Sequence, residues 1–347
     1  MIEARYHDSV NVLQELVTQS SSAHGSAAPA PSPFDRAEWY GLLAETGLTP
    51  LIAIASDDGA AAALALTEER GRITPLRNWY SFTWRQLAPE GEHGDRLLTE
   101  IARQLKTRGH RVTLEPVPGE DGSADRLARA FRKAGWRVEV SECDLNHVLE
   151  VNGRSFAEYW ASRPGPLRTT QKRKAKKVVV QISKTFDPVA WDHYEAIYAA
   201  SWKPEEDFPQ MLRDFARAEA EAGRLRFGLA YHEGTPVAAQ CWTVENGIAY
   251  IHKLAYLESM RKLSAGTTLS AALFEHVIDQ DRVQLVDFGT GDQPYKADWM
   301  DQTRIRYQID CLDMAQPRSW LSLAKLAFNR LRSDEALVEL APAPSAG

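Results

Sequence analysis

The chain has 347 residues, of which 44% are hydrophobic and 25% are charged, and its formal net charge is -6 at pH 7. This length and composition allow two globular domains with buried cores, and the negative net charge argues against a general nucleic-acid binder. Cys143, Cys241 and Cys311 are odd in number and far apart, which is typical of reduced thiols. No apolar run reaches the ~18 residues of a membrane span, and the N-terminus lacks the apolar region of a signal peptide. We therefore expect a cytoplasmic protein.

The first part of the chain contains a flexible segment and then alternating strands and helices. Residues 1–33 end in the low-complexity stretch Ser20–Pro33, which is typical of a mobile linker. Residues 34–152 form a first half. Its expected helices are 34–45, 93–108 and 123–134, and its expected strands are 49–56, 60–68, 72–78, 111–117, 137–143 and 146–151.

Residues 153–315 form a second half with the same order of elements: helices, three strands joined by short turns, a helix and a strand. Its expected helices are 154–177, 190–201, 208–222, 265–280 and a short one near Lys296, and its expected strands are 224–232, 235–244, 248–256, 283–288 and 304–311. The alternation indicates an α/β fold, and the repeated order indicates duplicated domains. Residues 316–347 are predicted to form an amphipathic basic helix and a frayed tail; docking on the protein core and lying on the inner membrane surface are the two alternatives.

Two segments of the second half predict a site for a phosphorylated cofactor beside a reaction centre. The first, Arg261–Leu269, is a turn of small residues that opens a helix, and such a turn leaves backbone N–H groups unpaired at the positive end of the helix dipole. This arrangement suits a pyrophosphate. The second, Val286–Lys296, is an apolar strand that ends in a Gly-rich turn followed by an acid, a tyrosine and a lysine.

The order of elements resembles the GNAT acyltransferase fold, and several segments look like the CelD-like bacterial family related to the tandem-GNAT Fem-type aminoacyltransferases. The resemblance implies two GNAT-like domains, each with a mixed, mostly antiparallel sheet flanked by helices. It extends over about residues 150–310, and over 34–150 by element order alone. The segments that carry it are Ser201–Lys203, Pro236–Gln240, Lys253–Tyr256, Leu263–Gly266 and Asp287–Lys296.

The resemblance implies an acyl-CoA as co-substrate, of acetyl or longer chain length, and no metal ion. The usual pyrophosphate signature of the fold is Arg/Gln-x-x-Gly-x-Gly/Ala, and here Ser264 replaces its first glycine. Serine adopts a tight turn less readily than glycine but adds a hydroxyl group. The first half has no such signature after its third strand, so we expect it to shape the acceptor site. The expected cofactor-binding residues are Arg261, Leu263, Ser264, Ala265, Gly266, Thr267 and Thr268.

Acyl transfer from a thioester to an amine needs a polarised carbonyl, an acceptor for the amine proton and a route for the thiolate to leave. The resemblance places Lys296 where Fem-type enzymes have a lysine that stabilises the oxyanion; the alternative is a surface salt bridge. Asp287 is either a base or a cap of the turn. His252 is either a base or a structural residue, and it is expected to point away from its neighbour Lys253. Tyr295 either protonates the leaving sulfur or packs.

The acceptor is expected to bind near exposed aromatic and charged residues. The run from Trp79 to Trp84 contains four aromatic residues, which either pack in the core or form a wall for a sugar or an acyl chain. The expected substrate-binding residues are Trp79, Tyr80, Trp84, Trp202, Lys203 and Asp292. Arg163–Lys177 has seven basic residues and no acid, which indicates either a solvated helix face or a surface for a phosphate-bearing acceptor, a tRNA or an anionic lipid.

We therefore predict a cytoplasmic acyltransferase that moves an acyl group from CoA to the primary amine of a small molecule in envelope, polysaccharide or lipid biosynthesis. An amino sugar, an amino acid derivative and a lipid amine are the expected acceptors, and peripheral contact with the inner membrane is an open alternative. No DNA partner is expected. The competing hypotheses are a Fem-type transferase that uses aminoacyl-tRNA, against which the net charge counts, and an inactive scaffold.

Overall fold

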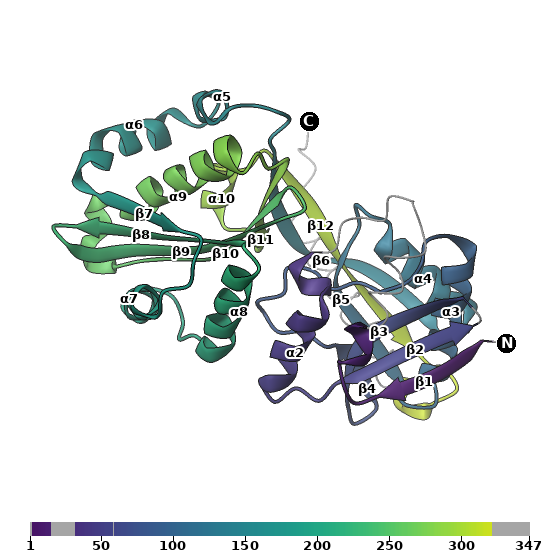
Figure 1. Cartoon of the computed structure of the whole chain (residues 1–347). Coiled ribbons are helices and arrows are strands. Elements are labelled where there is room, and N and C mark those ends of the chain that lie inside the picture. Colours follow the sequence, from purple (N-terminus) through teal and green to yellow (C-terminus); the bar gives the residue numbers. More distant parts are fainter. Residues whose placement is uncertain (1, 15–31, 58, 321–347) are drawn as a thin grey trace, which may run out of the picture.

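The computed structural model describes residues 2–14, 32–57 and 59–320. Their strands form one twelve-stranded sheet in the order β1-β2-β3-β4-β5-β12-β6-β11-β10-β9-β8-β7. Figure 1 shows two lobes joined by the long central strands β6 and β12. Most of the linker Ser20–Pro33 and most of the C-terminal segment 316–347 lie outside the described residues, and none of the described helices is long and apolar enough to cross a bilayer.

The first half places its helices over a sheet that begins at the N-terminal strand. The sheet is mostly antiparallel, but β4 and β5 pair in parallel, connected through α3. The elements of this half are β1 (Glu3–His7), η1 (Pro33–Asp35), α2 (Ala37–Glu45), β2 (Leu51–Asp57), β3 (Ala60–Glu69), β4 (Arg72–Pro75), α3 (Gly91–Leu105), β5 (Arg111–Pro118), α4 (Ser123–Lys133) and β6 (Arg137–Glu150).

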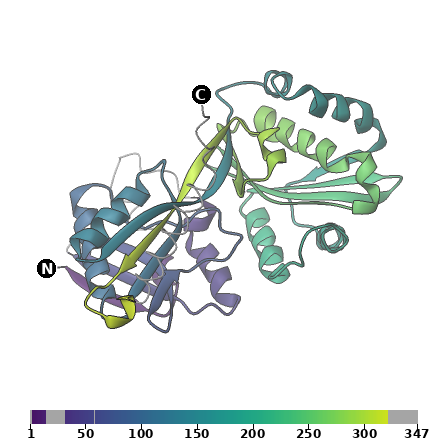
Figure 2. The same ribbon diagram turned by 180° about the vertical axis from the view of Figure 1, so that it is seen from behind.

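The second half repeats this plan. Its parallel pair is β10–β11, connected through α9; α9 packs on one face of the sheet and α7 on the other (Figures 1 and 2). The elements are α5 (Phe156–Ala161), α6 (Gly165–Lys174), η2 (Ala175–Lys177), β7 (Val179–Ser183), α7 (Pro188–Ala199), α8 (Pro209–Glu221), β8 (Leu225–His232), β9 (Thr235–Glu245), β10 (Ile248–Tyr256), η3 (Glu258–Leu263), α9 (Ala265–Glu275), the π-helical turn η4 (His276–Gln280), β11 (Leu285–Thr290), α10 (Pro294–Ala297) and β12 (Gln302–Leu312).

The sheet continues across the boundary that the sequence predicted between residues 152 and 153. The two strands predicted at 137–143 and 146–151 are one strand, β6, which pairs with β12 over most of its length and with β11 near its end. The last strand of the described residues, β12, inserts between β5 and β6 of the first half. The largest hydrophobic cluster also joins the halves, because it contains Trp39 and Phe82 together with Trp191 and Phe215. The halves therefore share a sheet and a core.

The helix predicted at 154–177 is wrong in detail. It is divided into α5 and α6 because Pro164 stands between them and a residue before proline disfavours helical geometry. The β-branched run that follows Lys177 forms the edge strand β7, which pairs with β8.

Candidate active site

Strands β10 and β11 separate in the middle of the second half. They pair in parallel over three residues only, from Ile248 with Leu285 to Tyr250 with Asp287, although β10 runs on to Tyr256 and β11 to Thr290. A β-bulge at His252, between Ile251 and Lys253, bends β10 just past the point of separation. The strands therefore open into a wedge past Tyr250 and Asp287.

Lys296 lies at this wedge and is buried, with 4% of its surface exposed. Its ammonium group donates to the carbonyl oxygen of Thr290 at 2.6 Å and to that of Gly289 at 3.3 Å. An ammonium has three N–H groups, so these bonds leave one for a further acceptor. Burial lowers the pKa of Lys296 to about 8, and the carboxylates of Asp287 and Asp144 oppose the shift. Its position does not match the alternative of a surface salt bridge to Asp292 or Asp298.

Asp287 is buried beneath the same turn and is held by two donors. Its Oδ1 accepts the N–H of Gly289 at 2.8 Å, and its Oδ2 accepts Nδ2 of Asn146 at 3.1 Å. Burial raises the pKa of Asp287, and Arg306 opposes the shift. These bonds favour the turn-capping role that the sequence left open.

Tyr295 stands at the outer side of the wedge and is partly exposed. Its ring meets that of Phe288 edge to face at 5.7 Å. Burial of the hydroxyl raises the pKa of Tyr295, so it stays protonated at neutral pH and can donate a proton. The Asp292 side chain is mostly exposed, and its Oδ1 lies 3.7 Å from Nε2 of His147, a buried residue that the sequence analysis did not identify.

His252 lies among aromatic rings rather than in an open cleft. Its Nε2 is 2.8 Å from Oγ1 of Thr243, and its ring contacts Phe34, Phe82 and Phe215. Burial lowers the pKa of His252 to about 3, so the imidazole is neutral. This environment favours the structural role. The sequence predicts that His252 and Lys253 point to opposite faces of the sheet. The bulge breaks the alternation of the strand, and both side chains contact aromatic residues of the first half: Phe34 and Phe82 for His252, Trp79 and Tyr80 for Lys253.

The predicted cofactor turn leads directly into α9. Ser264 is the N-cap of α9 with φ 50°, a left-handed conformation, and its side chain accepts no capping bond from the helix. Instead Ser264 Oγ lies 3.0 Å from Nζ of Lys174 at the end of α6. Arg261 is exposed on η3 and pairs with Glu258 at 3.6 Å. Gly266 lies beside the Tyr256 ring, while Ala265 and Thr268 are buried and Leu263 and Thr267 are partly buried.

The corresponding wedge of the first half is filled by its own chain. After β4 ends, residues 84–87 re-enter the sheet: the Trp84 N–H donates to the Pro116 carbonyl of β5, and Leu87 pairs with Ala63 of β3. Trp84 is buried and its indole N–H donates to Ala65 O at 2.8 Å, so it lies in the core and not on an acceptor wall.

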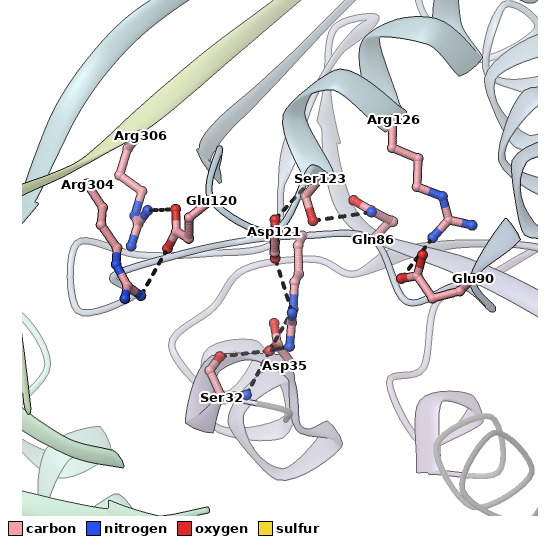
Figure 3. A network of polar contacts seen from close by, with 11 residues as sticks. Ser32, Asp35, Gln86, Glu90, Glu120, Asp121, Ser123, Arg126, Arg304 and Arg306 are labelled. Atoms are coloured by element: carbon pink, nitrogen blue, oxygen red, sulfur yellow. Dashed lines mark hydrogen bonds and ion pairs between the residues drawn. The ribbon is translucent and has the colours of Figure 1, made fainter. Parts of the chain in front are cut away.

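Polar contacts hold residues 84–87, which fill the first-half wedge, in place. Arg85 pairs with Asp35 and Asp121, and Gln86 donates to Ser123. Figure 3 shows the Gln86–Ser123 contact beside Glu120, which Arg304 and Arg306 of β12 approach. The loop after β4 is thus fixed on both sides.

Earlier in the same loop, Trp79 and Tyr80 lie against the second half. The Lys253 ammonium lies 3.8 Å from the Trp79 ring centroid and 4.1 Å from that of Tyr80, and it pairs with Glu206 at 2.9 Å. Glu206 also accepts the Tyr80 hydroxyl at 2.6 Å. The sequence analysis missed Glu206, because a glutamate in a polar loop carries no signal of its partners.

Trp202 and Lys203 lie near this cluster. Trp202 is half exposed, and its ring is tilted against that of Tyr256 with the centroids 4.5 Å apart, while the Lys203 ammonium lies 5.7 Å from the Tyr198 ring centroid. Burial lowers the pKa of Lys203 to about 8, and Glu206 opposes the shift. Besides burial, the charge of Lys203 contributes to lowering the pKa of Lys253 and of Lys296, so the three lysines lie near one another.

Residues 166–297 match the family model of the acetyltransferase (GNAT) domain. This range contains the wedge, the α9 turn and Lys296. No curated protein matches the sequence.

Solved structures share the fold over nearly the whole chain. The structure titled as FemX is 10% identical with a TM-score of 0.62, covering 90% of this chain and 97% of its own. The C-terminal domain of a putative lysylphosphatidylglycerol synthetase from Agrobacterium fabrum is 12% identical with a TM-score of 0.57, covering 92% and 97%. A tandem GNAT protein from the clavulanic acid pathway is 14% identical with a TM-score of 0.51, covering 89% and 98%. The predicted α/β fold with GNAT-like halves is confirmed.

Proposed function

We propose that the chain is an N-acyltransferase that moves an acyl group from a CoA-type thioester to the primary amine of a small acceptor bound at the junction of the halves. The observation that carries the proposal is the open wedge between β10 and β11 with buried Lys296 beside it. The filled wedge of the first half supports a single donor site, in the half that matches the GNAT domain.

In this proposal the donor's phosphates bind the α9 N-terminus and its thioester enters the wedge. The acceptor nitrogen attacks the thioester carbon, a C–N bond forms, and the carbonyl oxygen becomes an oxyanion. The free N–H of Lys296 points to that charge and stabilises it. When the intermediate collapses the C–S bond breaks, Tyr295 gives its proton to the sulfur, and the proton released by the amine restores Tyr295.

One observation favours a second candidate, transfer from aminoacyl-tRNA. Helix α6, from the basic run Arg163–Lys177, buries none of its side chains, and its Lys174 reaches Ser264 at the donor turn. A basic helix beside a donor entrance suits the phosphates of RNA as well as those of CoA. The CelD-like resemblance, a role in envelope or polysaccharide synthesis and contact with the inner membrane remain predictions.

Calorimetric titration of the whole chain with acetyl-CoA, palmitoyl-CoA, free CoA and an aminoacyl-tRNA tests the proposal. We expect a thioester to bind in the micromolar range with one site per chain. Binding of the tRNA alone would overturn the proposal in favour of the second candidate, and binding of none would favour a scaffold. Two thioester sites per chain would contradict the inference that residues 84–87 close the wedge of the first half to a donor.

A further inference from the structure

A pocket of 180 Å³ opens at the junction of the halves, next to the turn that seats Lys296. Its wall includes Arg77 and Trp79 from the first-half loop, Glu115 from β5, Asp144 from β6 and Thr290 from the end of β11. Thr290 supplies the carbonyl to which Lys296 donates at 2.6 Å. The pocket is smaller than the roughly 300–1,000 Å³ typical of drug-sized ligands, so it fits one ring or a short chain.

Trp79 gives the pocket an exposed aromatic surface. Its side chain is 51% exposed although it is large and apolar, and the Lys253 ammonium fixes it from the second half at 3.8 Å. An indole face carries negative electrostatic potential. The Lys253 ammonium already occupies one region of the ring, and the exposed part that lines the pocket attracts the polarised C–H groups of a sugar ring.

Asp144 gives the pocket a carboxylate without a cationic partner within ion-pair distance among the described residues. Its Oδ1 accepts the backbone N–H groups of Leu145 at 2.8 Å and Gly291 at 3.0 Å, which aims the carboxylate at the turn and leaves Oδ2 for a ligand. The neighbouring Glu115 is neutralised by Arg77 at 2.9 Å. This pair offers both an acceptor and donors, which suits sugar hydroxyls.

We propose that this pocket binds the acceptor and that the acceptor is an amine-bearing sugar ring. The ring lies on Trp79, its hydroxyls meet the Arg77–Glu115 pair, and its ammonium group binds Asp144 beside Thr290. The Asp144 carboxylate takes the extra ammonium proton before the neutral nitrogen attacks the thioester, and releases it to solvent afterwards. The inference rests on the proposed function, because this placement brings the amine next to Lys296 and the wedge. It adds a substrate class and assigns Arg77, Glu115 and Asp144, which the sequence did not.

Ligand-observed NMR titration of the whole chain with glucosamine, without any thioester, tests the proposal. Glucose and butylamine serve as probes that lack the ammonium or the ring. We expect glucosamine to bind and both analogues to bind at least about fivefold more weakly, because each loses one group of contacts. No glucosamine binding, or equal binding of either analogue, would overturn the proposed class.

Two variants locate the binding. Asp144→Asn keeps an oxygen for the two backbone N–H groups but removes the charge, so glucosamine should bind about tenfold more weakly while glucose is unaffected. Trp79→Ala should weaken both sugars, whereas Trp320→Ala, at an exposed tryptophan that bonds to Met314 O, should weaken neither. Unchanged glucosamine affinity in Asp144→Asn would place the amine elsewhere and overturn the assignment.

The calorimetric test of the donor separates the two claims. Thioester binding without glucosamine binding would leave the acyltransferase proposal standing and reject the amino-sugar pocket. Glucosamine binding at Asp144 without thioester binding would keep the amino-sugar pocket and reject the acyltransferase proposal.

Discussion

The ammonium nitrogen of Lys253 on β10 lies 3.8 Å from the ring centroid of Trp79, a residue of the first half. The same nitrogen pairs with Glu206, which also accepts the Tyr80 and Tyr194 hydroxyls. This contact joins the halves where the donor wedge and the acceptor pocket meet. It fixes the position of an exposed indole that would otherwise be free to change rotamer.

Breaking this pair should destabilise the junction. Glu206→Gln leaves Lys253 as a buried charge without its carboxylate, and we expect a loss of about 3–5 kcal/mol in the free energy of unfolding. Adding Lys253→Met to Glu206→Gln should cost less than the sum of the single changes, as urea denaturation of the four proteins would show. The matched control is the more exposed pair Arg217–Asp214, where Arg217→Met should cost about 1 kcal/mol or less. Additive effects at Lys253 and Glu206 would contradict the coupling.

Removing the Lys296 ammonium should slow the chemical step. Lys296→Ala is expected to lower kcat by about 10²-fold or more with thioester affinity nearly unchanged, because the lost bond forms in the transition state. Lys184→Ala, at an exposed lysine paired with Asp281, is the control. A fully active Lys296→Ala protein would remove the oxyanion assignment.

The pH dependence of turnover gives an independent test of Lys296. The pKa of Lys296 is lowered to about 8, so its ammonium is present below this pH and lost above it. We expect kcat to fall as the pH rises through about 8. Lys296→Arg stays charged, so whatever activity it retains should lack this fall. A wild-type profile that keeps rising through pH 9 would contradict the assignment.

The left-handed backbone of Ser264 predicts the effect of restoring the usual glycine. Ser264→Gly should stabilise the protein by about 1 kcal/mol and keep thioester affinity, because the strain falls and the unpaired N–H groups remain. Ser264→Val should weaken binding about tenfold or more, since a β-branched residue resists this conformation. Arg282→Gly, at another positive φ, should stabilise without changing binding. Loss of thioester binding in Ser264→Gly would show that the hydroxyl, and not the turn, holds the donor.

Gly289 is required both for its backbone and for its neighbour. It has φ 70°, and an added Cβ would lie 2.8 Å from two carbons of Phe82. Gly289→Ala should cost about 1–2 kcal/mol for the conformation and about 1–3 kcal/mol more for overpacking. Gly234→Ala, at φ 80° in open space, measures the cost of the conformation alone. Adding Phe82→Leu to Gly289→Ala should recover some of the cost of overpacking. Equal costs at Gly234 and Gly289, measured by urea denaturation, would contradict the close packing.

Lys203 should lower stability at neutral pH. The pKa of Lys203 is about 8 in the folded state, against an ordinary value of 10.5. Between these two pH values the unfolded chain binds more protons than the folded chain, so the free energy of unfolding rises with pH. Below pH 8 the penalty of burying the charge is fully present. Lys203→Met should therefore be more stable at pH 7 and gain less between pH 8 and 10. Lys133→Met, at an exposed lysine of α4, should change neither, and a less stable Lys203→Met at pH 7 would refute the argument.

Local features of the donor half could be predicted from the sequence. The turn before α9 and the Gly-rich turn after β11 each lie within about ten consecutive residues, so turn chemistry alone identifies them. Partners far apart in the chain could not be predicted. Glu206 and Lys253 are separated by 47 positions, and no local pattern links Trp79 or Asp144 to either. The insertion of β12 between β5 and β6 was missed for the same reason.

The sequence by itself determined the repeated α/β order, the small-residue turn at Ser264 and the lysine after the last glycine turn, because each depends on residues close in the chain. Only the tertiary structure decided which of two similar wedges is open. In the first half, residues 84–87 pair with Ala63 and Pro116, more than twenty positions away on either side, and satisfy the backbone groups that the separated strands would expose. In the second half no described segment re-enters between β10 and β11 in this way, so past Tyr250 and Asp287 their facing backbone groups have no strand between them.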